Sequence, residues 1–130
     1  MKPLQSIFIV DDDPIHQQIT EIMLERLRIA DKVSKFSDAQ DVLDHIRLNA
    51  ADPSGLPDLI LLDLNMPVMD GWEFLEVFAE LRYQLSKPVR IYVLTSSIDE
   101  RDRQRVDQFD FVSGYLTKPL TNDIIMALLP

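Results

Sequence analysis

The feature that most constrains the fold of this chain is a regular alternation between short apolar runs and longer segments with helical spacing. Continuous apolar runs of this length are typical of strands buried on both faces. We place strands at residues 6–10, 32–36, 58–62, 89–97 and 113–116. Because parallel strands need crossover helices on both faces of their sheet, the alternation predicts a doubly wound α/β domain with a five-stranded parallel sheet.

The segments between the strands have apolar residues three or four positions apart, as expected for helices with one buried face. In the first of them we expect a buried stripe formed by Ile15, Ile19, Ile22, Met23 and Leu27. The third helix is predicted over residues 70–85, and the charged segment 98–110 should form the loosest helix. Residues suited to cap helix N-termini precede these segments, and we predict caps at Asp13, Ser37, Asp70 and Ser97.

Composition limits the possible functions. A chain of 130 residues with 46% hydrophobic content has the size of one domain, and we expect residues 1–130 to form it. The net charge of −9 disfavours binding to nucleic acid or to an anionic membrane. The chain contains no cysteine, and no apolar stretch approaches the roughly 18 residues of a membrane span. We therefore expect a cytoplasmic protein.

Chemically active side chains follow the predicted strands at their carboxyl ends. They are Asp11, Asp12, Asp63, Thr95 and Lys118. Ligands of doubly wound sheets bind outside this edge, so we expect three carboxylates and one ammonium to meet there. An isolated aspartate at a strand end is usually a turn or capping residue. The interpretation of Asp63 therefore depends on the other four side chains.

Carboxylates brought this close destabilise a fold unless a cation joins them. An oxygen-only set without histidine or cysteine suits Mg²⁺ better than zinc or copper. Phosphoryl transfer needs a nucleophile in line and positive charge or donors on the phosphoryl oxygens. Asp63 can attack as a carboxylate. Mg²⁺, Lys118 and the Thr95 hydroxyl can each hold an oxygen, so the pattern indicates phosphoryl transfer to Asp63.

Four motifs resemble those of one family in their order and spacing: "IVDDDP", "LLDLNMPVMDG", "VLTSS" and "YLTKPL". Together they resemble the receiver domain of two-component response regulators over essentially the whole chain. The resemblance implies a flavodoxin-like fold with strand order 2-1-3-4-5. It also implies that Asp63 accepts a phosphoryl group from a sensor histidine kinase or a histidine phosphotransfer protein, and that the chain then changes its contacts with a downstream protein.

The same resemblance implies a role for each matching residue. Asp12 would bind Mg²⁺ directly, Asp11 would bind it through water, and Asn65 would bind it through its backbone carbonyl. Thr95 and Lys118 would contact the phosphoryl group.

Two further features follow from the resemblance. Tyr115 would be the rotating aromatic that, with Thr95, reports the state of the site. The peptide bond between Lys118 and Pro119 is often cis in the family.

Since no effector domain is present, the chain would act as a single-domain regulator through protein contacts rather than as an enzyme.

Two alternatives remain open. A Mg²⁺-dependent phosphohydrolase also uses a strand-end aspartate, but such enzymes commonly place a second aspartate two residues later, where this chain has Asn65. A pseudo-receiver that only binds partners would be expected to lack part of the acidic set or the lysine. His16 and His45 show no partner pattern, and we expect both at the surface.

Overall fold

The computed structural model describes residues 4–64, 66, 69–95 and 99–129, which form one parallel five-stranded sheet. Its strands are β1 (Leu4–Val10), β2 (Ala30–Phe36), β3 (Leu59–Asp63), β4 (Arg90–Thr95) and β5 (Val112–Thr117). The order across the sheet is β2-β1-β3-β4-β5, and every neighbouring pair is parallel. The predicted fold class and strand order are confirmed.

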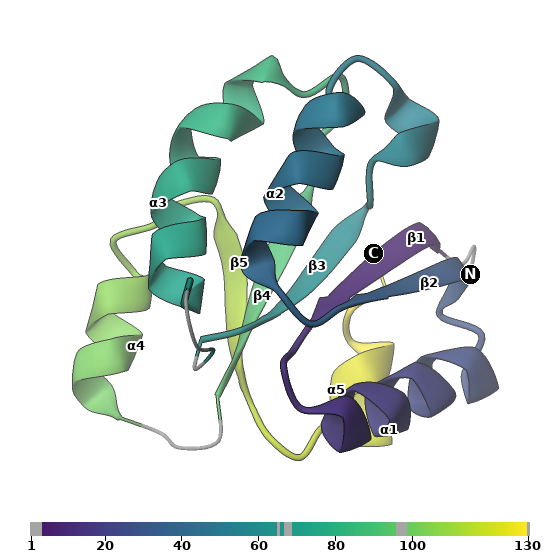
Figure 1. The fold of residues 1–130 in the computed structure, drawn as a ribbon. Coiled ribbons are helices and arrows are strands. Elements are labelled where there is room, and N and C mark those ends of the chain that lie inside the picture. Colours follow the sequence, from purple (N-terminus) through teal and green to yellow (C-terminus); the bar gives the residue numbers. More distant parts are fainter. Residues whose placement is uncertain (1–3, 65, 67–68, 96–98, 130) are drawn as a thin grey trace.

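Helices cover both faces of the sheet (Figure 1). They are α1 (Pro14–Arg26), α2 (Ala39–Leu48), α3 (Gly71–Leu81), α4 (Glu100–Val106) and α5 (Asn122–Met126). In Figure 1, α2, α3 and α4 lie on one side, and α1 and α5 lie on the other. The helix predicted over 70–85 is shorter, because α3 ends at Leu81 and the chain continues as a 3₁₀ turn, Arg82–Gln84.

The central strand β3 is buried on both faces, as its continuous apolar sequence predicts. Alternate side chains of a strand point to opposite faces. Accordingly, Ile60 and Leu62 pack in the core under α2, α3 and α4. Leu59 and Leu61 pack in the second core, with α1 and α5. This strand therefore delivers Asp63 at the point where the buried interior ends.

The predicted buried stripe of α1 is wrong in three positions. Ile15, Ile19 and Ile22 are 70%, 51% and 44% exposed, whereas Thr20 and Leu24 are buried. At about 3.6 residues per turn, the three isoleucines share a side of the helix that faces away from Thr20 and Leu24. Helix α1 thus has two apolar stripes, and the one with Leu24 faces the sheet.

Two of the four predicted caps are wrong by one or two positions. Asp38, not Ser37, caps α2, and its side chain accepts from the backbone amide of Gln40. Asp99 caps α4, while Ser97 lies outside the described residues. Aspartate caps a helix at least as well as serine, so an adjacent aspartate can take the position. The caps predicted at Asp13 and Asp70 are confirmed.

Asp58 ties the amino-terminal edge of the sheet together, at the opposite end from Asp63. Its Oδ2 accepts from the backbone amides of Gln5 and Ser6 at 2.7 and 3.2 Å, and its Oδ1 lies 2.9 Å from Lys87 Nζ. Burial alone would raise the pKa of Asp58. The hydrogen bonds from Lys87 and the two amides, with the charge of Lys87, outweigh burial and hold that pKa below its ordinary value.

Replacing Asp58 with asparagine should therefore lower the free energy of unfolding at pH 7 by about 1–2 kcal/mol. A group whose pKa is lowered by folding stabilises above its unfolded pKa of about 3.9, and this contribution is lost as the pH falls through its folded pKa. The deficit should shrink in urea unfolding below about pH 4. The exposed Asp31→Asn serves as control. A deficit that stays constant down to pH 2 would contradict this assignment.

Candidate functional site

Three carboxylates meet at the carboxyl edge of the sheet. Asp11 and Asp12 directly follow β1, and Asp63 is the last residue of β3, the neighbouring strand. Asp11 is fully buried, Asp63 is 4% exposed and Asp12 is exposed. One oxygen atom of each carboxylate lies within 4.8 Å of an oxygen atom of each of the other two. The structure thus brings together the three predicted metal-binding side chains.

Lys118 links two of these carboxylates. Its Nζ lies 3.1 Å from Asp11 Oδ2 and 3.2 Å from Asp63 Oδ2. Its backbone amide donates to the carbonyl of Thr95 at 2.8 Å, which joins the ends of β4 and β5. The predicted ammonium therefore lies between the ends of β1 and β3, although it comes from a distant part of the chain.

The site is strongly charged at neutral pH. Burial would raise the pKa of Asp11, but the Asp13 amide, the charge and hydrogen bond of Lys118, and His16 together lower it. Burial would lower the pKa of Lys118, but attraction to Asp63 and Asp11 raises it. An ionised Asp11 and a charged Lys118 therefore stabilise each other.

Two of the remaining predicted residues lie on β4 and β5. Thr95 is the last residue of β4 and is 1% exposed. Tyr115 on β5 is half-buried and packs against the core under α2, α3 and α4. Asn65 lies outside the described residues. The peptide bond between Lys118 and Pro119 is cis, as the resemblance implies.

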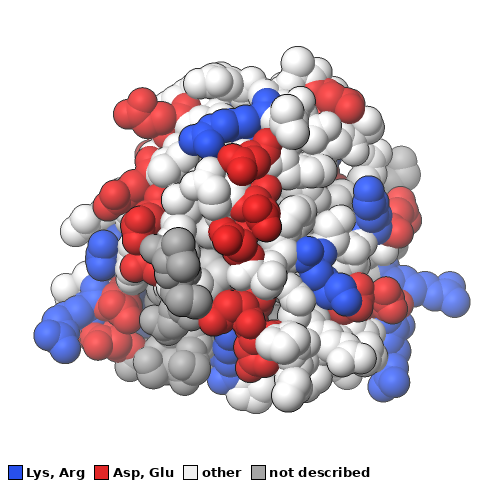
Figure 2. All heavy atoms as spheres, in the orientation of Figure 1, with Lys and Arg blue, Asp and Glu red and all other residues white. Residues whose placement is uncertain are grey.

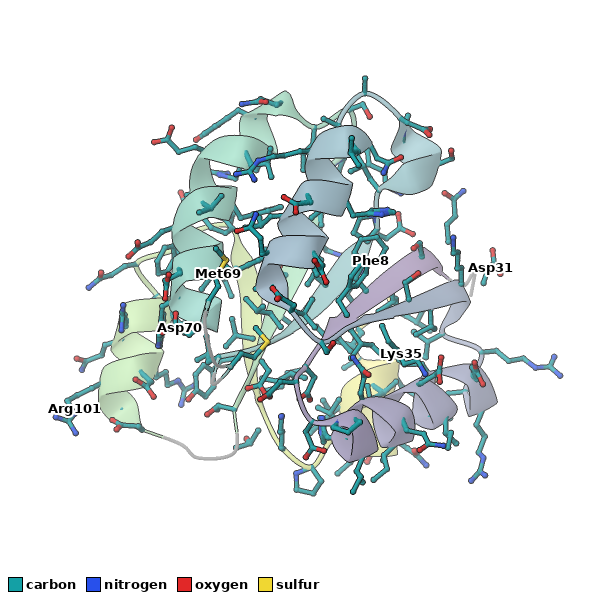
Figure 3. The ribbon with its side chains drawn as sticks, in the orientation of Figure 1. Phe8, Asp31, Lys35, Met69, Asp70 and Arg101 are labelled. Carbon is teal, nitrogen blue, oxygen red and sulfur yellow. The ribbon has the colours of Figure 1, made fainter. Side chains whose placement is uncertain are left out.

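The start of α3 lies close to the end of β3, where the Gly71 amide donates to the Leu64 carbonyl at 3.1 Å. Asp70 caps α3 by accepting from the Glu73 amide at 2.9 Å, and Figure 3 shows Asp70 at the start of that helix. A Cβ on Gly71 would lie 2.7 Å from Leu64 Cα and 2.8 Å from the carbonyl oxygen of Asp63. Only glycine allows this close approach. Gly71 and Asp70 therefore fix the start of α3 against the site.

Neither histidine was expected to have a partner, and this expectation is wrong: both are only partly exposed, and both contact another residue. His16 Nδ1 lies within hydrogen-bonding distance of Asp11 Oδ2, and its side chain is 14% exposed. His45 Nε2 lies 3.1 Å from the Gly55 carbonyl, and its ring packs 5.3 Å from that of Phe8. Figure 3 shows Phe8 on β1. A signal for His16 existed, because helical side chains lean toward the helix N-terminus, where Asp11 lies.

The donor set suits a hard divalent cation. Among the described residues, the cluster that can hold a metal consists of the three carboxylates alone. Mg²⁺ prefers a few carboxylate oxygens together with water. His16 contacts Asp11, so the expectation that no histidine lies near the carboxylates is wrong. His16 does not belong to the cluster, however, and the candidate ligand atoms are all oxygens, as predicted.

Comparisons with known proteins agree with this geometry. The family model for the response regulator receiver domain matches residues 7–129. The probable methanogenesis regulatory protein FilR2 of Methanothrix harundinacea (strain 6Ac) is 31% identical over 115 residues, which are 88% of this chain and 72% of that protein. No helix in the described part of the chain is long and apolar enough to cross a membrane.

Solved structures show the same fold. The crystal structure of a response regulator receiver protein from Dyadobacter fermentans DSM 18053 has a TM-score of 0.83 and 30% identity, and the match covers 95% of this chain and 94% of that one. A two-component response regulator from Cytophaga hutchinsonii has a TM-score of 0.87 at 23% identity, covering 98% and 95%. The sequence match over 7–129 and these structures show that the chain belongs to the response regulator receiver domain family.

Proposed function

We propose that this chain is the phosphoacceptor of a two-component relay and that Asp63 takes the phosphoryl group from a phosphohistidine. One observation carries the proposal: Lys118 contacts both Asp63 and Asp11, whose carboxylates cluster with that of Asp12 at the edge of a parallel sheet. Receiver domains bind Mg²⁺ at an acidic pocket and interact with histidine kinases or phosphotransfer proteins. They are typically signalling modules rather than enzymes.

In the transfer, a carboxylate oxygen of Asp63 attacks the phosphorus atom and forms an acyl phosphate. The bond between phosphorus and the donor's imidazole nitrogen breaks, and its electron pair stays on that nitrogen. Lys118 and the Thr95 hydroxyl hold phosphoryl oxygens. When bound, Mg²⁺ supplies the remaining positive charge. Asp12, Asp11 and the Asn65 carbonyl would hold it.

Intact mass measured after incubation with acetyl phosphate and Mg²⁺ separates this function from the alternatives. A receiver gains the mass of one phosphoryl group and loses it with time. A phosphohydrolase instead consumes the substrate continuously with many turnovers, and a pseudo-receiver does neither. Sustained turnover or the absence of any adduct would therefore contradict the proposed function.

Three exposed isoleucines follow the site carboxylates along α1. Helix α1 begins at Pro14, directly after the site carboxylates, and Ile15, Ile19 and Ile22 continue along its outer side. A donor protein that brings its phosphohistidine to Asp63 can reach this helix, because α1 starts beside the site. We propose that its own apolar side chains pack against these isoleucines.

Replacing both Ile15 and Ile19 with alanine should lower the rate of phosphotransfer from a donor protein about tenfold or more, because buried apolar contact with the donor is lost. The rate with acetyl phosphate should not change, since this small donor needs no docking surface. Leu48→Ala, at the far end of α2 and 87% exposed in the parent, is the matched control. Equal loss with both donors would assign the isoleucines to folding or to the site itself.

Phosphorylation is proposed to move the part of the molecule that includes Thr95, α4 and Tyr115. The Thr95 hydroxyl would move toward the phosphoryl oxygens, and Tyr115 would turn into the space it leaves. Val106 is the buried residue of α4, so this short helix should shift at low energetic cost.

In an NMR comparison of the free chain with its beryllofluoride adduct, which stands in for the phosphoryl group, amides of residues 95–118 should shift more than those of 14–50. A ligand shifts an equilibrium between two states only through contacts that differ between them. The Thr95 hydroxyl would supply such a contact with the adduct, so Thr95→Ala should reduce the shifts in 95–118. Equal or reversed perturbation of the two segments would contradict this route.

The downstream target is proposed to be a protein rather than nucleic acid. The chain has 22 acidic and 13 basic residues. Figure 2 shows acidic side chains across the middle of the face that Figure 1 presents. Such a surface repels phosphate backbones.

A further inference from the structure

Asp11 Oδ2 is fully occupied by donors within the protein. It accepts from His16 Nδ1 and, at 3.1 Å, from Lys118 Nζ, while Oδ1 accepts from the Asp13 amide at 2.9 Å. A carboxylate oxygen has about two acceptor positions, and both on Oδ2 are in use. An ionised carboxylate can only accept hydrogen bonds, so the hydrogen of this contact belongs to His16 Nδ1.

The start of α1 holds His16 in place. His16 is the third residue of the helix, and its amide is capped by Asp13 Oδ1 at 3.3 Å. The next side chain, Gln17, donates through Nε2 to the carbonyls of Asp11 and Phe36 at 3.2 and 3.0 Å. These bonds fix the first turn to the ends of β1 and β2. The fold therefore holds the backbone of His16 next to Asp11.

We propose that His16 competes with Mg²⁺ for Asp11 and so sets the Mg²⁺ concentration at which the site fills. This inference rests on the proposed function, because it concerns the same acidic site. Asp13 and Lys118 already orient the Asp11 carboxylate. What His16 adds is a further donor that satisfies buried negative charge, which a divalent cation would otherwise satisfy.

Competition by His16 can change the affinity for Mg²⁺ without a change at the reacting carboxylate. Lys118 also contacts Asp63, so any change at Lys118 alters the reacting carboxylate directly. His16 contacts Asp11 from outside the cluster of three carboxylates. The residue at position 16 can therefore tune the affinity for Mg²⁺ while Asp63 and Lys118 stay unchanged.

The test is an NMR titration with Mg²⁺ alone, without a phosphoryl donor, that follows the amides next to the three carboxylates. His16→Leu removes the donor, and its dissociation constant for Mg²⁺ should fall about fivefold or more. His16→Phe removes the donor but keeps a ring, and it should give the same result if the leucine variant does not fold. His16→Asn places an amide nitrogen near the position of Nδ1 and should bind Mg²⁺ like the parent.

His45→Asn is the matched control, because His45 contacts the Gly55 carbonyl and not the site. Unchanged or weaker Mg²⁺ binding in the leucine and phenylalanine variants would overturn the inference while leaving the proposed function intact. Tighter binding in the asparagine variant as well would also overturn it, because the donor would then not be the cause. If neither the parent nor any His16 variant binds Mg²⁺, the proposed metal site itself fails, and the inference fails with it.

Discussion

The Asp63→Asn variant should accept no detectable phosphoryl group from acetyl phosphate in the presence of Mg²⁺, a loss of at least about a hundredfold in initial rate. An amide of the same size is neutral and cannot attack phosphorus as a carboxylate does. The substitution also removes one of three crowded carboxylates, so the fold should remain intact. Intact mass and thermal unfolding measure the two effects separately.

Asp70→Asn is the matched control for this variant. Asp70 also follows β3 and caps α3, and asparagine caps a helix as well as aspartate does. Its phosphorylation should equal that of the parent. Undiminished phosphorylation of the Asp63 variant would show that another residue is the acceptor.

Removal of the exposed carboxylate of the site should abolish stabilisation by Mg²⁺. At a Mg²⁺ concentration ten times the dissociation constant, binding raises the free energy of unfolding of the parent by about 1.4 kcal/mol. Asp12→Ala should show almost none of this effect, because one of the three clustered carboxylates is gone. Thermal unfolding with and without millimolar Mg²⁺, beside calorimetric titration, measures it.

The neighbouring Asp13 provides the control for Asp12. Asp13 accepts from the Ile15 and His16 amides as the cap of α1, and Asp13→Asn should keep both the cap and the response to Mg²⁺. If Mg²⁺ leaves the melting temperature of the parent unchanged and calorimetry detects no binding, the site does not hold the metal.

Most of the fold could be predicted from the alternation of strand-like runs and helical segments, because the three central strands β1, β3 and β4 are largely buried and therefore apolar. Sequence spacing could not predict which face of α1 is buried, because this helix has two apolar stripes. It indicated that α1 is a helix, but Ile15, Ile19 and Ile22 repeat as regularly as the residues that face the sheet. Only the packing of α1 against the sheet and α5 decides that Leu24 is buried and Ile15 is not.

The site could be predicted as far as its members follow strands. Asp11, Asp63 and Lys118 each come at or just after a strand end, and parallel strands bring these ends to one edge. His16 comes from the first turn of a helix, so its contact with Asp11 depends on how that turn is held against β1 and β2. The hydrogen bonds of Gln17 that hold it have no sequence signature.

A peptide map of the chain after acetyl phosphate and Mg²⁺ treatment tests the central claim most directly. Tandem mass spectrometry should place one phosphoryl group on Asp63 and none on Asp11, Asp12 or His16. An adduct on any residue other than Asp63 would contradict the account of this site, and so would a chain that stays unmodified while its fold is intact.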